Sequence, residues 1–283
     1  MIAALTAALS LATVQSPAPE TLPVQPIRAS KIILVGDSTT AVVGGWGPSF
    51  CAYHVTSFAA CVNLARGGRS SGSYIAEGSW DLALSEMATP GFAATYVLIQ
   101  FGHNDQPGKP GRSTDLATEF PANLKRYVAE ARARGATPIL LTPLVRRQFV
   151  DGRLQNDLEP WAEAVRAVAA ETDTPLVDLN HASAEAVQAL GPAMSARFAQ
   201  AAPSPEVAAA LLTGTTIASS TGVAPAPGAP AAAQNNAAVE PLGQARVAFD
   251  YTHVGREGAD FFAALVTRDL IAAAPAMRRL LIP

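Results

Sequence analysis

Short apolar segments alternate with longer helical segments from residue 31 onward, and this alternation constrains the fold more than any other feature. Each apolar segment is followed within two residues by Gly, Pro or Asn, and the segments cover residues 32–35, 62–65, 96–101, 138–142 and 176–179. Short apolar runs that end in this way are typical of strands buried on both faces of a parallel sheet. We expect five such strands.

Helical patterns separate the predicted strands and close the chain. They cover residues 81–87, 117–134, 160–171, 182–189 and 258–274. Strand–helix alternation predicts a doubly wound α/β sheet with right-handed crossovers. Functional sites in such sheets lie at the carboxyl ends of the strands. The residues that follow each predicted strand are therefore the candidates for chemistry.

Composition and charge exclude several classes of protein. Of 283 residues, 49% are hydrophobic and only 15% are charged, which argues against disorder and against a coiled coil. The net charge is −3 and no block of like charge occurs, which argues against nucleic-acid and anionic-membrane partners. The longest apolar run, at residues 2–14, is shorter than the roughly 20 residues that span a bilayer.

The N-terminal segment has the pattern of a signal peptide. Residues 2–14 form an apolar stretch, and small residues at 12–16 suit cleavage. No Lys or Arg precedes Arg28, so the alternative is a short N-terminal helix of a cytoplasmic protein. We expect a signal peptide over residues 1–16 and a Pro-rich lead-in over 17–29, and therefore a secreted or periplasmic protein.

One domain is expected over residues 30–275, with an insertion at residues 203–241. The insertion is rich in Ala, Pro, Thr, Ser and Asn and carries almost no charge. Such a composition predicts a long flexible loop, with a Pro-rich middle that does not favour a helix. A surface insertion and a functional loop both fit this pattern.

The two cysteines, Cys51 and Cys61, lie ten residues apart. A zinc site needs about four ligands, and neither a C-x-x-C motif nor paired His residues lie nearby. An exported protein could join the two cysteines in a disulfide, and the alternative is two buried thiols. The sequence leaves both open.

Ser38 follows the first predicted strand, in the sequence GDSTT at residues 36–40. Nucleophiles of α/β enzymes occupy this place, because the glycine permits a tight turn and a following helix aims N–H groups at a developing oxyanion. The alternative is a serine that caps an ordinary strand-to-helix turn.

A competing serine, Ser70, lies in the sequence GRSSG at residues 68–72. This sequence matches the G-x-S-x-G nucleophile elbow, which leads into a well-packed helix. Gly72 and Ser73 are poor helix formers at such a start. We therefore favour a glycine loop that brings a backbone N–H close to the site.

The third predicted strand ends in the sequence GHND at residues 102–105. The Asn104 amide can project an N–H toward the same pocket as Ser38. His103 is a candidate base, but adjacent strand residues point to opposite faces. We therefore expect that His103 and Asn104 do not both face the pocket.

Asp250 and His253 lie three residues apart, just before the last predicted helix. At this spacing the carboxylate can hold the imidazole and fix its tautomer, so that His253 acts as a general base. A local Asp–His cap at the start of the helix is the alternative.

These segments together resemble the SGNH, or GDSL-like, hydrolase family, whose four blocks carry a Ser, a Gly, an Asn and a D-x-x-H. Within that family the chain resembles the rhamnogalacturonan acetylesterase branch. The segments that carry the resemblance are GDST at 36–39, ARGGRSSGSY at 65–74, FGHNDQ at 101–106, TPLVRRQF at 142–149 and DYTHV at 250–254. The resemblance covers roughly residues 31–202 and 247–274, and the insertion departs from the pattern.

The resemblance implies a three-layer α/β/α sandwich with a central, mainly five-stranded parallel sheet, as in the flavodoxin-like SGNH hydrolase fold. It implies that Ser38 is the nucleophile, that His253 is the general base and that Asp250 orients His253. It also implies an oxyanion hole that is made by the N–H of Ser38, a glycine N–H and the side chain of Asn104. We choose Gly68 for the glycine because it precedes Arg-Ser, as in the family, and the neighbouring Gly67 remains possible.

The implied activity is the removal of acetyl groups from a plant cell-wall polysaccharide, above all acetylated rhamnogalacturonan, with no metal and no organic cofactor. Because a pectic backbone carries galacturonate charges, Arg69, Arg146 and Arg147 are candidate substrate-binding residues. Surface charges or structural ion pairs are the alternative for each. Rival functions are the same chemistry on acetyl-xylan, a lipid or a thioester, and carbohydrate binding on an inactivated fold. The oligomeric state stays open.

Overall fold

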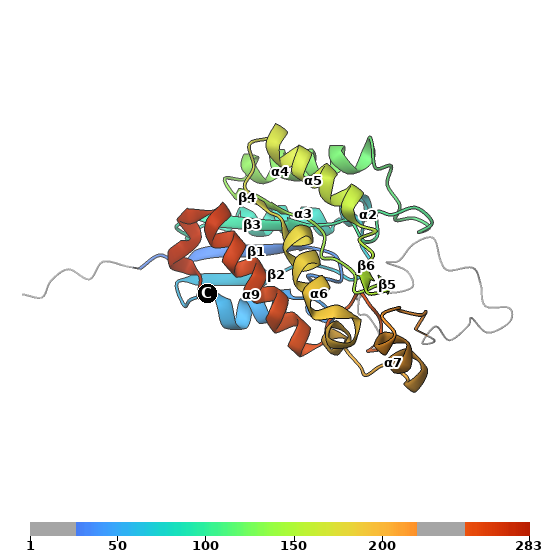
Figure 1. The fold of residues 1–283 in the computed structure, drawn as a ribbon. Helices are drawn as coiled ribbons and strands as arrows, with labels where there is room; N and C mark the ends of the chain where they lie inside the picture. Colours follow the sequence, from blue (N-terminus) through green and yellow to red (C-terminus); the bar gives the residue numbers. More distant parts are fainter. Residues whose placement is uncertain (1–26, 220–246) are drawn as a thin grey trace, which may run out of the picture.

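The computed structural model describes residues 27–219 and 247–283 (Figure 1). Within these ranges five strands form one sheet in the order β2-β1-β3-β4-β7, and every pairing is parallel. The strands are β1 (Ser30–Gly36), β2 (Ala59–Asn63), β3 (Thr95–Gln100), β4 (Thr137–Leu141) and β7 (Leu176–Val177). The predicted five-stranded parallel sheet is confirmed.

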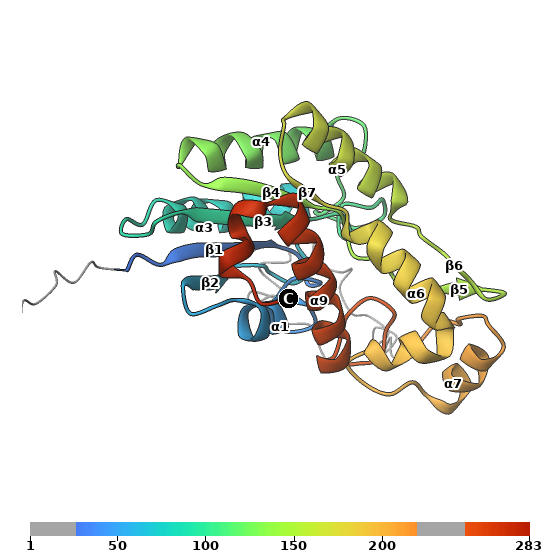
Figure 2. The same ribbon diagram turned by 60° about the vertical axis from the view of Figure 1, so that its left-hand side comes forward.

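Helices cover both faces of this sheet. Ile32 and Leu34 of β1 pack with residues of η1, α6 and α9, whereas Ile33 and Val35 pack with residues of α2, α3, α4 and α5. Figures 1 and 2 show α6 and α9 on one side of the sheet and α4 and α5 on the other. The fold is therefore the three-layer α/β/α sandwich that the resemblance implies.

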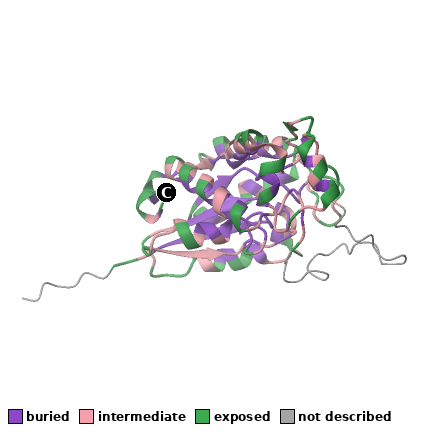
Figure 3. Cartoon of the chain, turned by 60° about the horizontal axis from the view of Figure 1, so that its bottom comes forward, coloured by how far each residue is buried: buried purple, intermediate pink, exposed green. Residues whose placement is uncertain are grey.

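The sheet is flanked by helices of very different length. Their bounds are α1 (Gly47–Ser49), η1 (Phe50–His54), α2 (Ser71–Ala76), α3 (Ser79–Met87), α4 (Glu119–Ala133), α5 (Glu159–Glu171), α6 (Leu179–Ser195), η2 (Ala196–Phe198), α7 (Pro205–Leu212), α9 (Arg256–Ala273) and η3 (Pro275–Leu280). Buried residues run through the central sheet and exposed residues lie on the outer helix surfaces (Figure 3). Burial on both faces explains why the strands read as continuous apolar runs.

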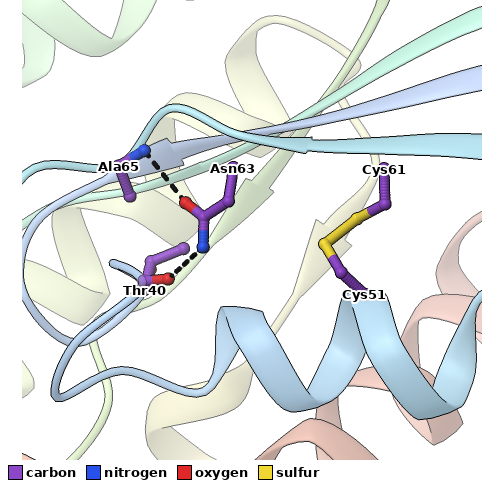
Figure 4. The surroundings of a disulfide bond; sticks show 5 residues. All are labelled: Thr40, Cys51, Cys61, Asn63 and Ala65. Carbon is purple, nitrogen blue, oxygen red and sulfur yellow. Dashed lines mark hydrogen bonds between the residues drawn. A yellow bond between two sulfur atoms is a disulfide. The ribbon is translucent and has the colours of Figure 1, made fainter.

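The second strand lies earlier than expected, at β2 rather than at residues 62–65. The side chain of Asn63 ends it, because its Nδ2 donates to the Thr40 carbonyl at 2.9 Å and its Oδ1 accepts from the Ala65 N–H at 3.0 Å (Figure 4). The apolar residues after Asn63 therefore belong to the connection and not to the strand.

Cys51 and Cys61 form a disulfide (Figure 4). Cys51 lies in η1 and Cys61 in β2, so the bond ties a helical segment to the edge strand of the sheet. Of the two alternatives that the sequence leaves open, the structure has the disulfide.

The first part of the 203–241 insertion contains a helix, α7, where a loop is expected. Ser204 caps the helix by accepting from the Val207 N–H at 3.3 Å, and Pro205 occupies the first turn, where its missing N–H costs nothing. The four residues Ala208–Leu211 continue it with good helix formers. A short antiparallel hairpin, β5 (Phe149–Val150) and β6 (Arg153–Leu154), is also absent from the prediction.

Two predictions concern residues outside the described ranges. The signal peptide and most of the lead-in fall on residues 1–26, and the Pro-rich middle of the insertion falls on residues 220–246. In the described part of the chain, no helix is long and apolar enough to cross a membrane.

Candidate active site

Ser38 lies in a turn directly after β1. The side chain of Asp37 is fully buried and fixes this turn, because its Oδ1 accepts from both the N–H and the hydroxyl of Thr39 at 2.8 Å. The expected helix after Ser38 is absent, since the chain continues in turns until α1 begins at Gly47. Backbone turns, and not a helix N-terminus, therefore place the Ser38 N–H.

Ser38, His253 and Asp250 form a continuous chain of hydrogen bonds. The Ser38 Oγ lies 2.8 Å from Nε2 of His253, and Nδ1 of His253 lies 2.7 Å from Oδ2 of Asp250. When Nδ1 carries the ring proton and donates a hydrogen bond to Asp250, Nε2 is left as the acceptor for the Ser38 hydroxyl. The structure thus brings Ser38 next to an Asp–His pair that lies more than 200 positions later in the sequence.

Asp250 is held as an anion by its own turn. Its Oδ1 accepts from the N–H groups of Thr252 and His253, each at 2.7 Å. Burial raises the pKa of Asp250, but the hydrogen bond and charge of His253 and the two backbone donors outweigh it, so the pKa lies below its usual value. An ionised Asp250 can orient the His253 imidazole.

Arg147 holds the same turn from behind and is not exposed for substrate binding. Its guanidinium donates to the carbonyls of Asp250 (3.0 Å), Thr252 (3.2 Å) and His253 (2.8 Å), and its side chain is 1% exposed. Burial lowers the pKa of Arg147 to about 10, so it stays charged at neutral pH. Arg147 was expected to contact substrate, but in the structure it binds backbone carbonyls of the Asp250–His253 turn instead.

Arg69 is also buried and supports the glycine turn at residues 67–68. Its Nε pairs with Glu77 at 2.9 Å and its Nη1 donates to the Gly67 carbonyl at 2.8 Å. The Arg69 carbonyl in turn accepts from Nδ2 of Asn104 at 3.1 Å. Because Arg69 has no exposed surface, its expected contact with substrate is not possible in this structure.

Gly68 and Asn104 are placed where they could donate to an oxyanion. Gly68 has a φ of 76°, a left-handed conformation that favours glycine. Asn104 uses one of its two Nδ2 hydrogens for the Arg69 carbonyl, so the other can point into the pocket. Gly67 and Gly68 both line that pocket, and the choice between them stays a prediction.

Ser70 caps a helix and is completely buried. Its hydroxyl accepts from the Ser73 N–H at 3.1 Å at the start of α2, in a capping box. A helix therefore does begin at Ser71, despite the poor propensity of Gly72 and Ser73, because the cap satisfies its first N–H groups. Within the described residues Ser70 is not part of the pocket lining.

These groups surround one polar pocket of about 260 Å³, which we call the inner pocket. It is lined by Ser38, Gly67, Gly68, His103, Asn104, Lys109, Arg112, Arg146, Thr252 and His253. His103 and Asn104 both line it, contrary to expectation. The strand β3 ends at Gln100, and Gly102, with a φ of 145°, breaks the alternation of faces on which the expectation depended.

His103 is a buried histidine beside Asp37. Its Nδ1 lies 3.4 Å from Oδ2 of Asp37, and neither ring nitrogen has a hydrogen-bond partner in the described part of the chain. Burial lowers the pKa of His103, and this effect outweighs the charge of Asp37, which acts in the opposite direction. The neutral ring is therefore favoured. The imidazole within hydrogen-bond distance of Ser38 is that of His253, at 2.8 Å.

Three lining residues were not singled out by the sequence: Lys109, Arg112 and Thr252. Lys109 and Arg112 belong to the connection between β3 and α4, and the signal for them was two basic residues in a loop that leaves the carboxyl end of a strand. In the described part of the chain, no three His, Cys, Asp or Glu side chains gather in a way that could hold a metal ion.

Comparison with known proteins decides the family. The model of the GDSL-like lipase/acylhydrolase family matches residues 34–198. The chain belongs to this family. Together with the two relatives named acetylesterases that are described next, this family makes the chain a carboxylic ester hydrolase. The matched range includes Ser38, Gly68 and Asn104, whereas Asp250 and His253 lie beyond it and reach the site through the fold.

Two curated relatives of the chain come from Bacillus subtilis. The chain is 36% identical over 158 residues to the probable rhamnogalacturonan acetylesterase YesY, and the match covers 53% of this chain and 70% of YesY. It is also 36% identical over 176 residues to the rhamnogalacturonan acetylesterase RhgT, and this match covers 59% of this chain and 72% of RhgT. The resemblance to the rhamnogalacturonan acetylesterase branch is confirmed.

The fold is also similar to the crystal structure of the protein YxiM from Bacillus subtilis. The TM-score is 0.57 at 22% identity, and the match covers 88% of this chain and 58% of that one. This likeness concerns the fold alone.

Proposed function

We propose that this esterase removes acetyl groups from acetylated rhamnogalacturonan through an acyl-enzyme on Ser38. The observation that carries the proposal is the hydrogen-bonded chain from Asp250 through His253 to Ser38, open to a polar pocket beside Gly68 and Asn104. The choice of polysaccharide is supported by the 36% identity to YesY and RhgT.

In the first half of the reaction, Ser38 Oγ attacks the acetyl carbonyl carbon while Nε2 of His253 takes the hydroxyl proton. The carbonyl oxygen becomes an oxyanion, to which the N–H groups of Ser38 and Gly68 and the amide of Asn104 donate. Each such donor typically lowers the barrier by about 3 kcal/mol. The bond to the sugar oxygen then breaks, and that oxygen takes the proton from His253.

In the second half, water attacks the acetyl-Ser38 ester. His253 takes a proton from this water and returns it to Ser38 Oγ as acetate leaves. Asp250 stays ionised throughout and holds the imidazole in the tautomer that the reaction needs. The reaction consumes one water and yields acetate and a free sugar hydroxyl.

The shape of the site suits an acetyl group on a carbohydrate chain. A second polar cavity of about 660 Å³, the outer cleft, shares Lys109, Arg146 and Thr252 with the inner pocket. In our proposal the acetyl group enters the inner pocket and the polysaccharide continues along the outer cleft. The polar lining of both favours sugar hydroxyls over a long acyl chain.

We also propose that the protein acts outside the cytoplasm. The proposal is supported by the apolar pattern at residues 2–14 and by the Cys51–Cys61 disulfide, a bond that persists in oxidising compartments.

The test of the proposed function is acetate release from three substrates by the purified protein. We expect acetylated rhamnogalacturonan to be deacetylated faster than acetyl-xylan, and p-nitrophenyl esters of long acyl chains to be poor substrates. Equal or greater rates on acetyl-xylan would contradict the proposed polysaccharide. A preference for long acyl chains would contradict a carbohydrate acetylesterase altogether.

A further inference from the structure

We propose that Lys109 and Arg112 bind a carboxylate of the sugar chain beside the acetyl group, so that the enzyme selects acetylated uronate polymers over neutral polysaccharides. The inference rests on the proposed function and adds the residues that would give it specificity. Neither residue belongs to the hydrogen-bonded chain of Ser38, His253 and Asp250.

The inner pocket has a positive wall. Lys109, Arg112 and Arg146 all line it, and among the described residues none that lines it is acidic. Arg146 is already partly neutralised, because its Nη1 pairs with Asp157 and its Nε donates to the hydroxyl of Thr252 at 3.3 Å. The charges of Lys109 and Arg112 therefore dominate the wall.

Lys109 is not neutralised by an ion pair. Within the described residues, its ammonium makes neither a hydrogen bond nor an ion pair, although the side chain is partly buried. Burial lowers the pKa of Lys109 and the charges of Arg146 and Arg112 lower it further, while the charges of Asp157 and Asp37 oppose this shift without outweighing it. A carboxylate bound at this position would relieve the repulsion among the three cations, because opposite charges within a few ångströms favour the charged form of each.

Arg112 lines the same pocket, and its donors are not fully used in the described part of the chain. Its Nη1 lies 3.5 Å from the Gly68 carbonyl, at the limit of a hydrogen bond, and its buried Nε has no partner in the described part of the chain. A guanidinium carries five N–H donors in a fork that fits a carboxylate. Contact with the glycine turn places this fork next to the proposed oxyanion donor, and so next to the acetyl group.

This arrangement predicts selectivity as well as attraction. A uronate that carries the acetyl group, or lies beside it in the chain, can present its carboxylate to Lys109 and Arg112. A neutral sugar that fills the pocket displaces water from both cations without replacing the lost hydrogen bonds. Leaving such groups unpaired penalises the wrong substrate, which is how polar sites discriminate.

The experiment crosses a charge change in the protein with a charge change in the substrate. Acetate release is measured on acetylated rhamnogalacturonan and on the same polymer after methyl esterification of its carboxylates. We expect esterification to lower kcat/KM of the unaltered protein by roughly tenfold or more, as for loss of a hydrogen-bonded charge. In Lys109→Gln and in Arg112→Gln the ratio of kcat/KM on the charged polymer to kcat/KM on the esterified polymer should move toward one. In Lys109→Arg this ratio should stay as in the unaltered protein.

Lys125→Gln is the matched control, because Lys125 lies on α4 and pairs with Glu171, away from the pocket lining. This variant should keep the full preference. A second measurement needs no variant, since added salt should shrink the preference of the unaltered protein by screening the charges.

Two results would overturn the inference while the proposed function stands. One is equal kcat/KM of the unaltered protein on the charged and the esterified polymer. The other is an unchanged ratio in Lys109→Gln and Arg112→Gln. Failure of the unaltered protein to release acetate from either polymer would instead overturn the proposed function, and the inference with it.

Discussion

Arg147 reaches the carbonyls of Asp250, Thr252 and His253 from a fully buried position. A buried guanidinium is stable only when its donors are paired, so the cation and the turn depend on each other. The TPLVRRQF segment therefore carries two adjacent arginines with different tasks. Arg146 lines the pocket, and Arg147 fixes the backbone that presents His253.

Arg147→Lys should lower kcat far more than it raises KM. Lysine keeps the charge but cannot reach three carbonyls with one ammonium, so the Asp250–His253 turn loses its fixed position. A displacement of about 1 Å at the general base can reduce the rate roughly 100-fold. Steady-state kinetics with p-nitrophenyl acetate measure the split, and Arg134→Lys on the exposed end of α4 is the control. A kcat equal to that of the unaltered protein would refute this role.

Asp250→Asn should keep the fold and lose about 10⁴-fold in kcat, because the amide favours the tautomer in which Nε2 carries a proton and cannot accept one from Ser38. His253→Ala should lose at least as much. The double variant should be no worse than the worse single variant, since the residues act as a unit.

The pKa of Asp250 lies below its usual value, so protonation of this carboxylate should not limit kcat/KM until the pH falls well into the acidic range. Full activity in Asp250→Asn would return His103 to consideration as the base.

At the scale of elements, the sequence predicts best where one physical pattern decides the structure. The inner strands β1, β3 and β4 are found because burial on both faces makes them nearly continuous apolar runs, whereas the edge strand β2 is half-buried and was predicted three residues late. The helix α4 is found because its core residues recur every three or four positions. Short elements are missed, since α2 and α7 depend on single capping serines. The expected start at residue 182 is three residues late, because Asp178 caps the helix and α6 begins at Leu179.

The candidate site is predicted to the extent that it follows strand ends. Ser38, Gly68 and Asn104 each come just after a strand of the sheet, and parallel strands bring their carboxyl ends to one edge. The roles of the arginines could not be predicted, because a sequence does not tell a buried guanidinium from one that faces a pocket. Lys109 and Arg112 were missed for the same reason.

The disulfide between η1 and β2 should stabilise the fold without serving the chemistry. A loop of about ten residues closed by a disulfide contributes roughly 2–3 kcal/mol in the chain-entropy account. Cys51→Ser with Cys61→Ser should therefore lower the Tm by several degrees and leave kcat unchanged at temperatures where the protein stays folded. Calorimetry of the variant and of the reduced parent measures this. An unchanged Tm in both would show that the bond adds no stability.

At the scale of the whole molecule, the pocket exists only when distant segments pack together. The turn after β1, the glycine turn after β2, the turn after β3 and the turn before α9 each supply part of its lining. The core on one face of the sheet includes residues of α9, and the core on the other face includes residues of α2. Loss of either layer should therefore abolish activity together with the fold.

The buried pair of His103 and Asp37 should make stability depend on pH. Because burial lowers the pKa of His103, the unfolded chain takes up a proton near pH 6.5 while the folded protein does not. The stability that the folded protein has with a neutral His103 is therefore fully present above about pH 6.5, and the free energy of unfolding decreases as the pH falls below that value. In urea unfolding between about pH 5 and 7.5, the unfolding free energy of His103→Gln should fall less steeply than that of the parent. His181→Gln, at an exposed position on α6, is the control. Parallel curves for His103→Gln and the parent would contradict the assignment.

In the proposed mechanism Ser38 is the nucleophile, positioned by His253 and Asp250, and the G-x-S-x-G serine Ser70 is only a helix cap. Labelling with a serine-directed phosphonate, followed by peptide mapping, distinguishes the two serines. We expect one adduct per chain, on Ser38, with parallel loss of acetate release, and no adduct in Ser38→Ala. Ser70→Ala should be labelled like the unaltered protein. An adduct on Ser70, or full labelling of Ser38→Ala, would show that Ser38 is not the nucleophile.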